Sequence, residues 1–317
     1  MKILVTGGAG YIGSHFCKTA AQAGHTVVAY DNLSTGHEYF VKFGPFVRGD
    51  IRTVDLLTKT MRVNKIEAVL HFAGKALVRE SMIKPEIYFE NNPYGTLCLL
   101  NAMHAAGVHN IVFSSSCSVY GVHDGLISET AAQSPINPYG QSKKQCEEIL
   151  FNLQTRYHLR IAILRYFNVI GQDPTGDIWE DHEPETHILP NILKAEMADT
   201  PVSILGASHP TADGTCIRDY IDVRDLVKAH LAALDKLKAS ATFVSNVGQG
   251  IGTSLYQLLH TYESVFQTKV KTEIKQAHPG DPPHLVANAT FFKSWYPHNL
   301  HAIDSSIQSL ALRRKLS

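Results

Sequence analysis

The stretch "ILVTGGAGYIGSHF", residues 3–16, decides the fold. It places three glycines, Gly7, Gly10 and Gly13, between a strand-like apolar run and a segment with helical periodicity. Glycines at this spacing permit a tight turn, a close approach of the backbone to a pyrophosphate, and close packing of the helix on the strand. The N–H groups that begin the helix can then bind the phosphates. The stretch therefore predicts a strand–turn–helix unit that binds a dinucleotide.

The next strand-like run, "TVVAYD" (residues 26–31), indicates which dinucleotide is bound. It ends in Asp31, whose carboxylate can accept both ribose hydroxyls and would repel the 2′-phosphate of NADP. Asn32, Leu33 and Ser34 follow, so no arginine is at hand for that phosphate. These residues favour NAD. The alternative is an ordinary glycine turn with a surface aspartate.

Strand-like and helical patterns alternate along the first half of the chain. Such alternation, with fully apolar strands, predicts a parallel sheet covered by helices on both faces. We expect an α/β fold: a Rossmann-like doubly wound parallel sheet with a smaller mixed α/β C-terminal substrate lobe. The expected strands are residues 2–6, 26–30, 68–72, 111–115 and 161–165, and the expected helices are residues 13–23, 53–63, 92–106 and 139–157.

The pattern becomes less regular after residue 168. The segment "IGQDPTGDIWEDHEPET" (residues 170–186) is loop-like, and the elements after it are shorter. We therefore expect an NAD-binding domain at residues 1–168 and a substrate lobe at residues 169–317. Residues 216–240, which include a helical pattern at 222–237, are expected to return to the first domain.

Composition excludes several classes of protein. The 317 residues carry 29 acidic and 29 basic side chains, so neither nucleic acid nor a membrane surface is an expected partner. The N-terminus lacks the pattern of a signal peptide, and no apolar run is long enough to span a bilayer. The 17 histidines show no HExxH or similar spacing, and no metal site is expected. The chain has five scattered cysteines: Cys17, Cys98, Cys117, Cys146 and Cys216. Their odd number and scattered positions favour a reduced, cytoplasmic protein.

The stretch "NPYGQSKKQCEEIL" (residues 137–150) contains a candidate proton-transfer pair. Asn137 can cap a helix whose first residue is Pro138. Tyr139 and Lys143 then lie one turn apart on the same side of that helix. Because a free phenol titrates near pH ~10, a neighbouring cation is needed before it can serve as a base near neutrality. The alternatives are a solvated helix face and an ordinary half-buried tyrosine.

Eight stretches in order resemble the extended short-chain dehydrogenase/reductase family, and within it the chain is most similar to the UDP-glucose 4-epimerases. The resemblance extends from Met1 to about Ile307. The stretches are "VTGGAGYIGSH" (5–15), "DNLSTG" (31–36), "GDIR" (49–52), "HFAG" (71–74), "SSSCSVYG" (114–121), "PYGQSKK" (138–144), "LRYFN" (164–168) and "PTADGTCIRDYI" (210–221).

The resemblance implies a catalytic set of Ser116, Tyr139 and Lys143. Tyr139 would be the acid/base at the sugar hydroxyl, Lys143 would hold the nicotinamide ribose and favour tyrosinate, and Ser116 would hydrogen-bond the reacting oxygen. Bound NAD would take a hydride from C4 and return it to the other face of a transient 4-keto sugar. The NAD would stay tightly bound and be recycled.

The resemblance also implies two sets of binding residues. The cofactor set is Gly7, Gly10, Tyr11, Ile12, Gly13, Asp31, Asn32, Asp50, Ile51, Phe72, Ala73, Asn92, Ser114, Tyr139, Lys143 and Tyr166. The substrate set, for a UDP-sugar, is Ser116, Tyr139, Asn168, His187, Arg218, His278, Asp281 and Leu285.

Three of these residues have an alternative role. Asp50 could instead cap the helix expected at residues 53–63. Asn92 could also cap the helix expected at 92–106, where Pro93 should begin or kink it. Arg218 could instead form a surface ion pair with Asp219. His278 stands in "AHPGDPPHLVAN" (277–288) where the family usually has arginine, and we expect weaker or pH-dependent UDP-sugar binding there.

The expected activity is C4 epimerisation of a UDP-hexose, with UDP-galactose and UDP-glucose as the pair. Sugar-nucleotide dehydratases of this family carry an acidic pair where this chain has Cys117 and Ser118, so dehydration is not expected. Leu285 favours plain hexoses over N-acetylhexosamines. The alternatives are a 4-epimerase of another UDP-sugar (an N-acetylhexosamine, a pentose or a uronate) and an NAD-dependent sugar-nucleotide reductase or dehydrogenase. Family members are usually homodimers, and the helices at 92–106 and 139–157 are the candidates for the interface.

Overall fold

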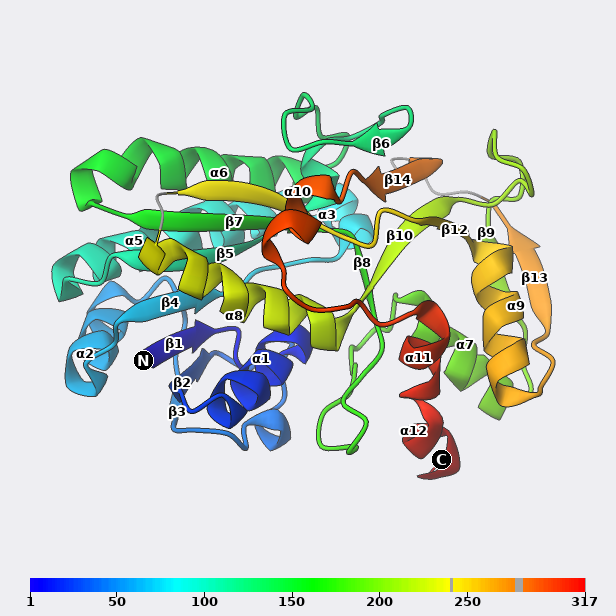
Figure 1. The fold of residues 1–317 in the computed structure, drawn as a ribbon, viewed down its shortest axis with the longest axis horizontal. Helices are drawn as coiled ribbons and strands as arrows, with labels where there is room; N and C mark the ends of the chain where they lie inside the picture. Colours follow the sequence, from blue (N-terminus) through cyan, green and yellow to red (C-terminus); the bar gives the residue numbers. More distant parts are fainter. Residues whose placement is uncertain (240–241, 277–281, 317) are drawn as a thin grey trace. The chain divides into compact units, whose positions relative to one another are not determined.

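The computed structural model of the chain describes residues 1–239, 242–276 and 282–316 and is drawn in Figure 1. Its contacts divide the chain into two compact units. The first unit contains Met1–Tyr120, Gln133–Arg165 and Val227–Ser245, and the second contains Gly121–Ala132, Tyr166–Leu226 and Asn246–Ser317. None of the described helices has the length and apolar character needed to cross a bilayer.

The first unit alternates strands and helices from its first residue. Its elements are β1 (Lys2–Thr6), α1 (Tyr11–Gln22), β2 (Thr26–Asp31), η1 (Glu38–Phe40), β3 (Phe46–Arg48), α2 (Val54–Asn64), β4 (Ala68–His71), α3 (Val78–Ile83), α4 (Pro85–Phe89), η2 (Glu90–Tyr94), α5 (Gly95–Ala106), β5 (Asn110–Ser116), η3 (Cys117–Val119), α6 (Pro138–Tyr157), β7 (Arg160–Tyr166), α8 (Val223–Ala239) and β11 (Phe243–Val247). Helix α8 begins in the second unit, and β7 and β11 each end there.

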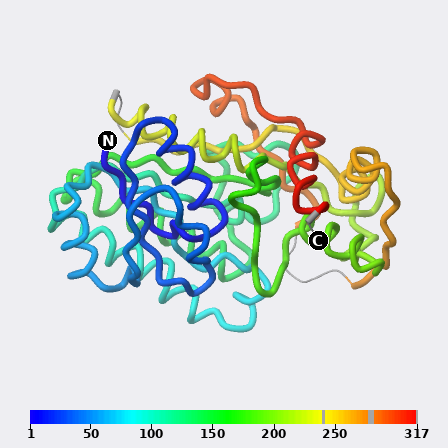
Figure 2. Tube along the Cα trace, turned by 90° about the horizontal axis from the view of Figure 1, so that it is seen from below, coloured from blue at the N-terminus to red at the C-terminus, as the bar shows by residue number. Residues whose placement is uncertain are grey.

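Seven strands of these elements form one sheet in the order β11-β7-β5-β4-β1-β2-β3. The pairs from β3 to β5 are parallel. Helices α2, α5 and α6 pack side by side against one face, and α1 lies on the other face (Figure 2). Apolar side chains such as Leu57, Leu99 and Leu150 fill the space between the sheet and this helical layer. This is the expected doubly wound Rossmann-like sheet, and it confirms the predicted α/β class.

The second unit is built from shorter elements. They are β6 (Leu126–Ile127), β8 (Asn168–Ile170), α7 (Ile188–Met197), β9 (Val202–Leu205), β10 (Ile217–Asp222), β12 (Gly252–Ser254), α9 (Leu255–Phe266), β13 (Thr272–Lys275), β14 (His284–Ala287), α10 (Thr290–Trp295), α11 (Ile303–Gln308) and α12 (Ala311–Leu316).

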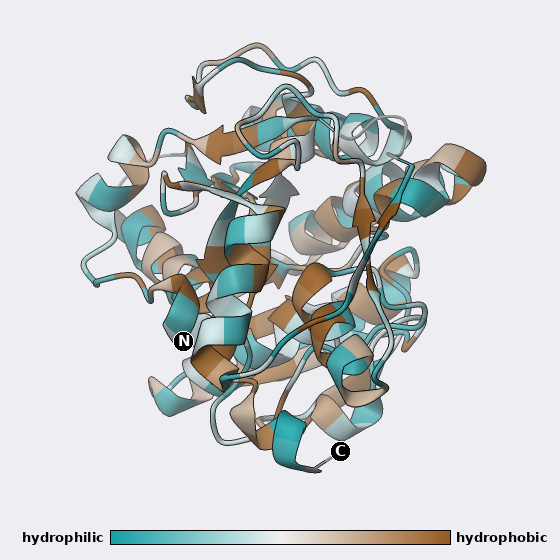
Figure 3. Ribbon diagram, turned by 90° about the vertical axis from the view of Figure 1, so that its right-hand side faces the viewer, coloured by the Kyte–Doolittle hydropathy of each residue, from teal (hydrophilic) through white to brown (hydrophobic). Residues whose placement is uncertain are grey.

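Strand β10 is the centre of the second unit. It pairs antiparallel with β12 and parallel with β8 and β14, and β14 also pairs with β6. Strands β9 and β13 form a separate parallel pair. Apolar residues of α7, α9 and β9, among them Ile192, Leu258 and Ile204, form a second core. In both units the helices carry a hydrophilic and a hydrophobic side, as Figure 3 shows in teal and brown.

The five strands expected in the first half of the chain are confirmed, and so are the helices at 13–23, 53–63 and 139–157, each shifted at its ends by no more than two residues. The helix expected to begin at Asn92 instead continues from α4, because Pro93 lies in a turn of π-helix between α4 and α5. The wider turn accommodates a residue that cannot donate an N–H. Asn92 is therefore not a helix cap.

The two units differ from the expected boundaries at several points. The main boundary follows Arg165 rather than residue 168, and the returning segment ends at Ser245 rather than at residue 240. Residues 121–132 belong to the second unit, because β6 pairs with β14, and a two-residue strand leaves no periodic pattern in the sequence. The segment that returns to the first unit begins at Val227 rather than at residue 216. The reason is that β10, at 217–222, pairs with β8, β12 and β14 of the second unit.

Candidate active site

The glycine loop between β1 and α1 leaves no room for a side chain at Gly7 or at Gly13. Gly7 has a φ of +73°, and a Cβ placed on it would lie 2.6 Å from the backbone nitrogen of Ala73. A Cβ on Gly13 would lie 2.0 Å from the backbone oxygen of Gly7. A Cβ on Gly10 would approach protein only at 3.4 Å, and Gly10 directly precedes the N-terminus of α1. The loop thus keeps its close packing at Gly7 and Gly13 and its accessible backbone at Gly10, which fits a bound pyrophosphate.

Asp31 ends β2 beside this loop and is buried. Its carboxylate accepts hydrogen bonds from the N–H groups of Ala9 (3.0 Å) and Leu33 (2.8 Å). Burial raises the pKa of Asp31, and these two N–H groups oppose that shift. A carboxylate offers about four lone-pair sites, so the two backbone bonds leave capacity for ribose hydroxyls. The alternative of a solvent-exposed surface aspartate is wrong.

Asp50 lies beyond the next strand and has side-chain partners. It accepts hydrogen bonds from Arg52 Nε (2.9 Å), from Arg52 Nη2 (2.8 Å) and from Asn32 Nδ2 (3.1 Å). The Arg52 guanidinium lowers the pKa of Asp50 to about 2. The residue that caps α2 is Thr53, so the alternative role of Asp50 as a helix cap is wrong.

Tyr139 and Lys143 lie in the first two turns of α6, which begins as expected. The side chain of Asn137 accepts the N–H of Gly140 (2.8 Å), and Pro138 is the first helical residue. Tyr139 is 7% exposed and Lys143 is 5% exposed. The alternative of a solvated helix face is therefore wrong.

Lys143 is held by the end of β5. Its Nζ donates to the backbone oxygen of Ser114 (2.9 Å) and lies 4.9 Å from the ring centroid of Phe113. Burial lowers the pKa of Lys143. A buried ammonium one turn from a buried phenol favours the ionised form of that phenol, because an opposite charge nearby stabilises the anion. The helix therefore places the buried phenol and the buried ammonium one turn apart, the spacing expected from the sequence.

Ser116 is the last residue of β5 and is buried. Its Oγ accepts the N–H of Ser118 (3.1 Å) and so caps the short helix η3. The hydroxyl hydrogen is not used in that bond and remains available for an oxygen atom of a substrate. Ser116, Tyr139 and Lys143 all belong to the first unit.

Three supporting residues of this unit were not among the candidates predicted from the sequence. Arg165 forms a buried ion pair with Glu147, with Nη2 and Oε2 2.6 Å apart. Glu147 also accepts the hydroxyl of Ser115 (2.5 Å), which ties α6 to β5. His230 of α8 shares a hydrogen bond (2.9 Å) with the hydroxyl of Ser114. Glu147 follows Lys143 by four residues on the same helix face, and that spacing was the signal available in the sequence.

Asn92 also has partners within the first unit. Its side chain binds the backbone N–H (2.8 Å) and the backbone oxygen (3.0 Å) of Lys75 and the hydroxyl of Ser142 (2.9 Å). It therefore joins η2 to α6 and to the loop after β4. That loop begins with Phe72 and Ala73, which directly contact Gly7. The remaining cofactor candidates in the first unit are Tyr11 and Ile12 in the first turn of α1 and Ile51 after β3; Tyr166 is grouped with the second unit.

The second unit brings three predicted substrate residues onto one face of its sheet. Arg218 of β10 pairs with Leu285 of β14. Asn168 of β8 pairs with Tyr220, which is two residues after Arg218 on β10. Paired residues of parallel strands, and residues two apart on one strand, point to the same face. Asn168, Arg218 and Leu285 therefore share a face, although they are far apart in the sequence.

Arg218 does not form the surface ion pair that we considered as an alternative. It is 6% exposed, and its Nη1 donates to the backbone oxygen of Ile217 (2.9 Å). Asp219 points to the opposite face, where it accepts the N–H groups of Gln249 (2.8 Å) and Gly250 (2.9 Å). Burial raises the pKa of Asp219 to about 6. The surface ion pair is therefore wrong.

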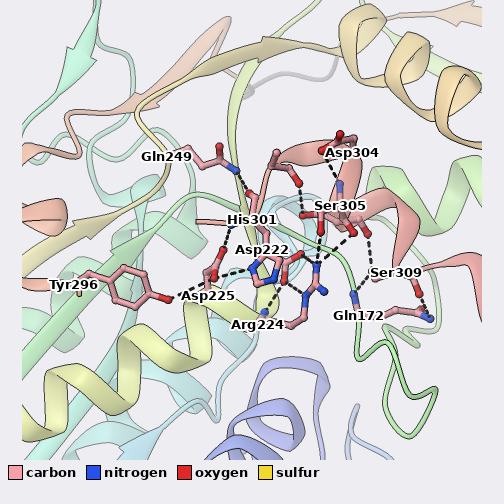
Figure 4. A network of polar contacts seen from close by, with 12 residues as sticks. Gln172, Asp222, Arg224, Asp225, Gln249, Tyr296, His301, Asp304, Ser305 and Ser309 are labelled. Atoms are coloured by element: carbon pink, nitrogen blue, oxygen red, sulfur yellow. Dashed lines mark hydrogen bonds and ion pairs between the residues drawn. The ribbon is translucent and has the colours of Figure 1, made fainter. Parts of the chain in front are cut away.

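A network of polar contacts joins the end of β10 to the C-terminal helices of the second unit (Figure 4). Asp222 accepts hydrogen bonds from Arg224 Nε (2.8 Å) and Nη2 (2.6 Å). Asp225 accepts the N–H of His301 (2.6 Å) and contacts the hydroxyl of Tyr296 at 3.4 Å. Asp222 is thus a buried carboxylate paired with Arg224.

Two further substrate candidates, His278 and Asp281, lie outside the described residues. His187 is the N-cap residue of α7, and its Nδ1 contacts a carboxylate oxygen of Glu180. Glu180, His182, Glu185 and His187 offer ligand atoms within 4.8 Å of one another. The spacing of these four residues in the sequence is not that of a helical metal motif, and the course of the loop brings their ligand atoms together.

Comparison with known proteins identifies close relatives. The family described as "NAD dependent epimerase/dehydratase family" matches residues 3–248. The chain is 43% identical to a UDP-glucose 4-epimerase of Rhizobium meliloti (strain 1021), over 98% of this chain and 97% of that protein. The crystal structure of UDP-glucose 4-epimerase from Brucella ovis in complex with NAD has a TM-score of 0.94 at 40% identity and covers 99% of this chain and 98% of its own. The crystal structure of the UDP-glucose-4-epimerase from Stenotrophomonas maltophila with bound NAD and formylated UDP-arabinopyranose is 35% identical to this chain and has a TM-score of 0.95. The match covers 100% of this chain and 98% of that one.

Proposed function

The chain belongs to the NAD dependent epimerase/dehydratase family, and on that premise we propose that it inverts C4 of a UDP-hexose and so interconverts UDP-galactose and UDP-glucose. The enzyme is an isomerase of the UDP-glucose 4-epimerase type, and NAD is its cofactor. The observation that carries the proposal is that Ser116, Tyr139 and Lys143 are all buried in the same unit as the glycine loop. A protein that only bound NAD would need no such set.

The first unit provides the groups that would hold NAD. The backbone at Gly10, Tyr11 and Ile12 would bind the pyrophosphate at the N-terminus of α1. Asp31 would accept the ribose hydroxyls of the adenosine half, and Lys143 would bind the ribose of the nicotinamide half. When bound, NAD would supply the hydride chemistry that the inversion of C4 requires.

The side chains of the first unit would move the proton. Tyr139 takes the proton from the 4-hydroxyl and later returns it, because the ammonium of Lys143 stabilises its ionised form. Ser116 donates its hydroxyl hydrogen to the reacting oxygen and fixes the position of that oxygen. The N–H of Ser118 in turn holds Ser116 Oγ (3.1 Å). The three groups therefore position and deprotonate one hydroxyl.

The second unit provides the groups proposed to bind UDP. The planar guanidinium of Arg218 suits a diphosphate because it can donate two parallel hydrogen bonds. Asn168 shares its face and can donate through its amide. Leu285 gives this face an apolar side chain that would limit the space at the sugar's C2 substituent. His187, His278 and Asp281 complete the proposed substrate set.

Product analysis tests the proposal directly. Purified protein is incubated without added NAD, once with UDP-galactose and once with UDP-N-acetylgalactosamine, and the products are identified by NMR. We expect conversion of UDP-galactose alone, with the cofactor retained through purification. Conversion of both sugars would keep the mechanism and remove the role of Leu285. If neither sugar reacts even with added NAD, the proposal is wrong, and a UDP-pentose or UDP-uronate becomes the substrate to try.

We further propose that the enzyme is a cytoplasmic homodimer. All five cysteines are free, which suits a reducing compartment. Tyr94, directly before α5, is 54% exposed, and Phe151 of α6 is 41% exposed. Exposed aromatic side chains beside two neighbouring helices are typical of an interface. Light scattering should give twice the mass of one chain for the native protein, and Phe151→Glu should shift it towards the mass of one.

A further inference from the structure

The chain between β8 and α7 is the longest irregular segment among the described residues of the second unit. It contains 17 residues, from Gly171 to His187, without a helix or strand. Irregular segments of this length in a compact protein usually carry a function, because their backbone needs other means of fixation. Six of its last eight residues are Asp, Glu or His, and four of them bring their ligand atoms together: Glu180, His182, Glu185 and His187.

These four side chains converge. One carboxylate oxygen of Glu180 lies 3.5 Å from Nδ1 of His182 and also contacts Nδ1 of His187. The same nitrogen of His182 lies 3.8 Å from Oε1 of Glu185. In a tetrahedral zinc site with bonds of about 2.0–2.2 Å, two ligand atoms lie roughly 3.3 Å apart. The ligand atoms of the cluster lie within 4.8 Å of one another, so most pairs would move closer around an ion, whereas Glu180 and His187 would move apart.

Burial makes this cluster unlike an ordinary group of surface charges. Glu180 is buried, and the side chain of Glu185 is only 3% exposed. Oε1 of Glu185 accepts the N–H groups of Thr186 (2.8 Å) and His187 (2.9 Å), whereas its buried Oε2 has no hydrogen-bond partner among the described residues. A buried carboxylate oxygen without a donor is costly unless something binds it.

The charge and the accessibility of the cluster also suit a cation. Against the effect of burial, hydrogen bonds to Glu180 and Glu185 raise the pKa of His182 to about 9, so an ion must displace protons from the imidazoles. With both imidazoles deprotonated, the two carboxylates give the cluster a charge of −2, which a divalent ion neutralises. Arg313 contacts the same loop at the backbone oxygen of Glu180 (3.2 Å) and at Asp181 (3.8 Å). The side chain of His187 is 47% exposed, so an ion can enter from solvent on that side.

We propose that Glu180, His182, Glu185 and His187 form a binding site for one divalent transition-metal ion, best matched by Zn²⁺. Two imidazoles and two carboxylates are ligands that zinc accepts in tetrahedral sites, whereas calcium and magnesium prefer oxygen atoms alone. The ion would be structural. Because His187 is also the N-cap residue of α7, the metal would fix the end of the loop to the start of that helix. The inference stands on this cluster and does not depend on the proposed function: it assigns the imidazole of His187 to the metal and leaves its backbone for the proposed substrate contact.

The test is metal binding by the full-length protein after removal of any affinity tag and treatment with a chelator. Zn²⁺ is titrated in competition with a chromophoric chelator, and Co²⁺ is added separately for its visible spectrum. We expect one Zn²⁺ per chain and the intense Co²⁺ bands of a four-coordinate site. The loop should also become more resistant to proteolysis when Zn²⁺ is added. A chain that binds no stoichiometric Zn²⁺, or that gives only the weak spectrum of six-coordinate Co²⁺, would overturn the proposal.

Matched variants locate the site. His182→Ala and Glu185→Gln should each weaken Zn²⁺ binding at least as much as loss of an outer partner does, which is about 10–100-fold. The controls are His260→Ala on α9 and Glu183→Gln in the same loop, both of which are exposed residues and should bind zinc as the native chain does. Equal Zn²⁺ affinity in all four variants would show that the metal binds elsewhere and would contradict the proposal. Since the Co²⁺ spectrum is taken on the native chain, a variant that fails to fold does not remove the test.

Discussion

The two units of the chain hold their candidate site residues in different ways. In the first unit, Ser116 ends a buried strand of a seven-stranded sheet, and Tyr139 and Lys143 occupy two turns of one long helix. In the second unit, Arg218 and Leu285 lie on separate short strands, and His187 lies at the end of a 17-residue irregular segment. A local motif fixes the first arrangement, and long-range strand pairing fixes the second. Substitutions should therefore separate chemistry in the first unit from substrate affinity in the second.

Tyr139→Phe should produce the largest effect, because it removes the acid/base and leaves the ring in place. We expect kcat to fall by about 10²–10⁴-fold, the usual contribution of a general acid–base group. The cofactor should still copurify, since the glycine loop and Asp31 are unchanged. The measurement is turnover of UDP-galactose together with the bound NAD content.

Tyr256→Phe is the matched control, because Tyr256 is an exposed tyrosine of α9 in the second unit. It should leave kcat unchanged. If Tyr139→Phe lost its NAD as well as its activity, Tyr139 would have a structural role, and the contrast between the two units would fail at its strongest point.

Glu147→Gln tests how much the buried ion pair between Glu147 and Arg165 stabilises the first unit. The substitution leaves the guanidinium of Arg165 buried without a charged partner, and breaking such a pair costs about 3–5 kcal/mol. Urea unfolding should show this loss in the free energy of unfolding. Asp235→Asn breaks the exposed pair with Lys238 and should cost less than about 1 kcal/mol. Equal losses of unfolding free energy from the two substitutions would show that burial does not determine how much an ion pair stabilises this chain.

Arg218→Lys should affect binding in the second unit with little change in the chemical step. A lysine keeps the positive charge but cannot donate two parallel hydrogen bonds to a diphosphate. We expect the Michaelis constant for UDP-galactose to rise by about 10–100-fold, which corresponds to the roughly 1.5–3 kcal/mol of a hydrogen bond to a charged group. A variant with lower kcat and an unchanged Michaelis constant would instead assign Arg218 to the chemistry.

The contrast between local motifs and long-range pairing also explains which features could be predicted from the sequence. The strands of the first unit, the start of α6 and its Asn137 cap follow from patterns a few residues long, and these were predicted from the sequence. The hydrogen bond between Ser114 and His230 spans 116 positions in the sequence, so no local pattern could reveal it. Strand β6 has two residues and no periodicity to detect.

The candidate site shows the same limit. The common face of Asn168, Arg218 and Leu285 depends on the register of three strands, which a single sequence does not encode locally. Glu180, His182, Glu185 and His187 do not repeat with helical spacing, and only the course of the loop brings their ligand atoms together. The resemblance to a known family supplied Arg218 and Leu285 as candidates, and the physical patterns alone would not have.

Glu196→Gln should give the smallest effect and completes the comparison, because its ion pair in the second unit is only partly buried. Glu196 accepts hydrogen bonds from Arg314 Nη2 (2.6 Å) and from the hydroxyl of Tyr262 (2.7 Å). The side chain of Glu196 is 11% exposed and that of Arg314 is 34% exposed.

The Arg314 guanidinium lowers the pKa of Glu196 from 4.5 to about 2. A carboxylate with a lowered folded-state pKa stabilises the fold above its unfolded pKa and loses that contribution as pH falls. We therefore expect the variant to be less stable by about 1 kcal/mol at pH 7, a value reduced for solvent screening. The difference should disappear between pH 4.5 and pH 2, as measured by thermal unfolding across that range. A difference that stayed constant with pH would mean that Glu196 acts through packing rather than through its charge.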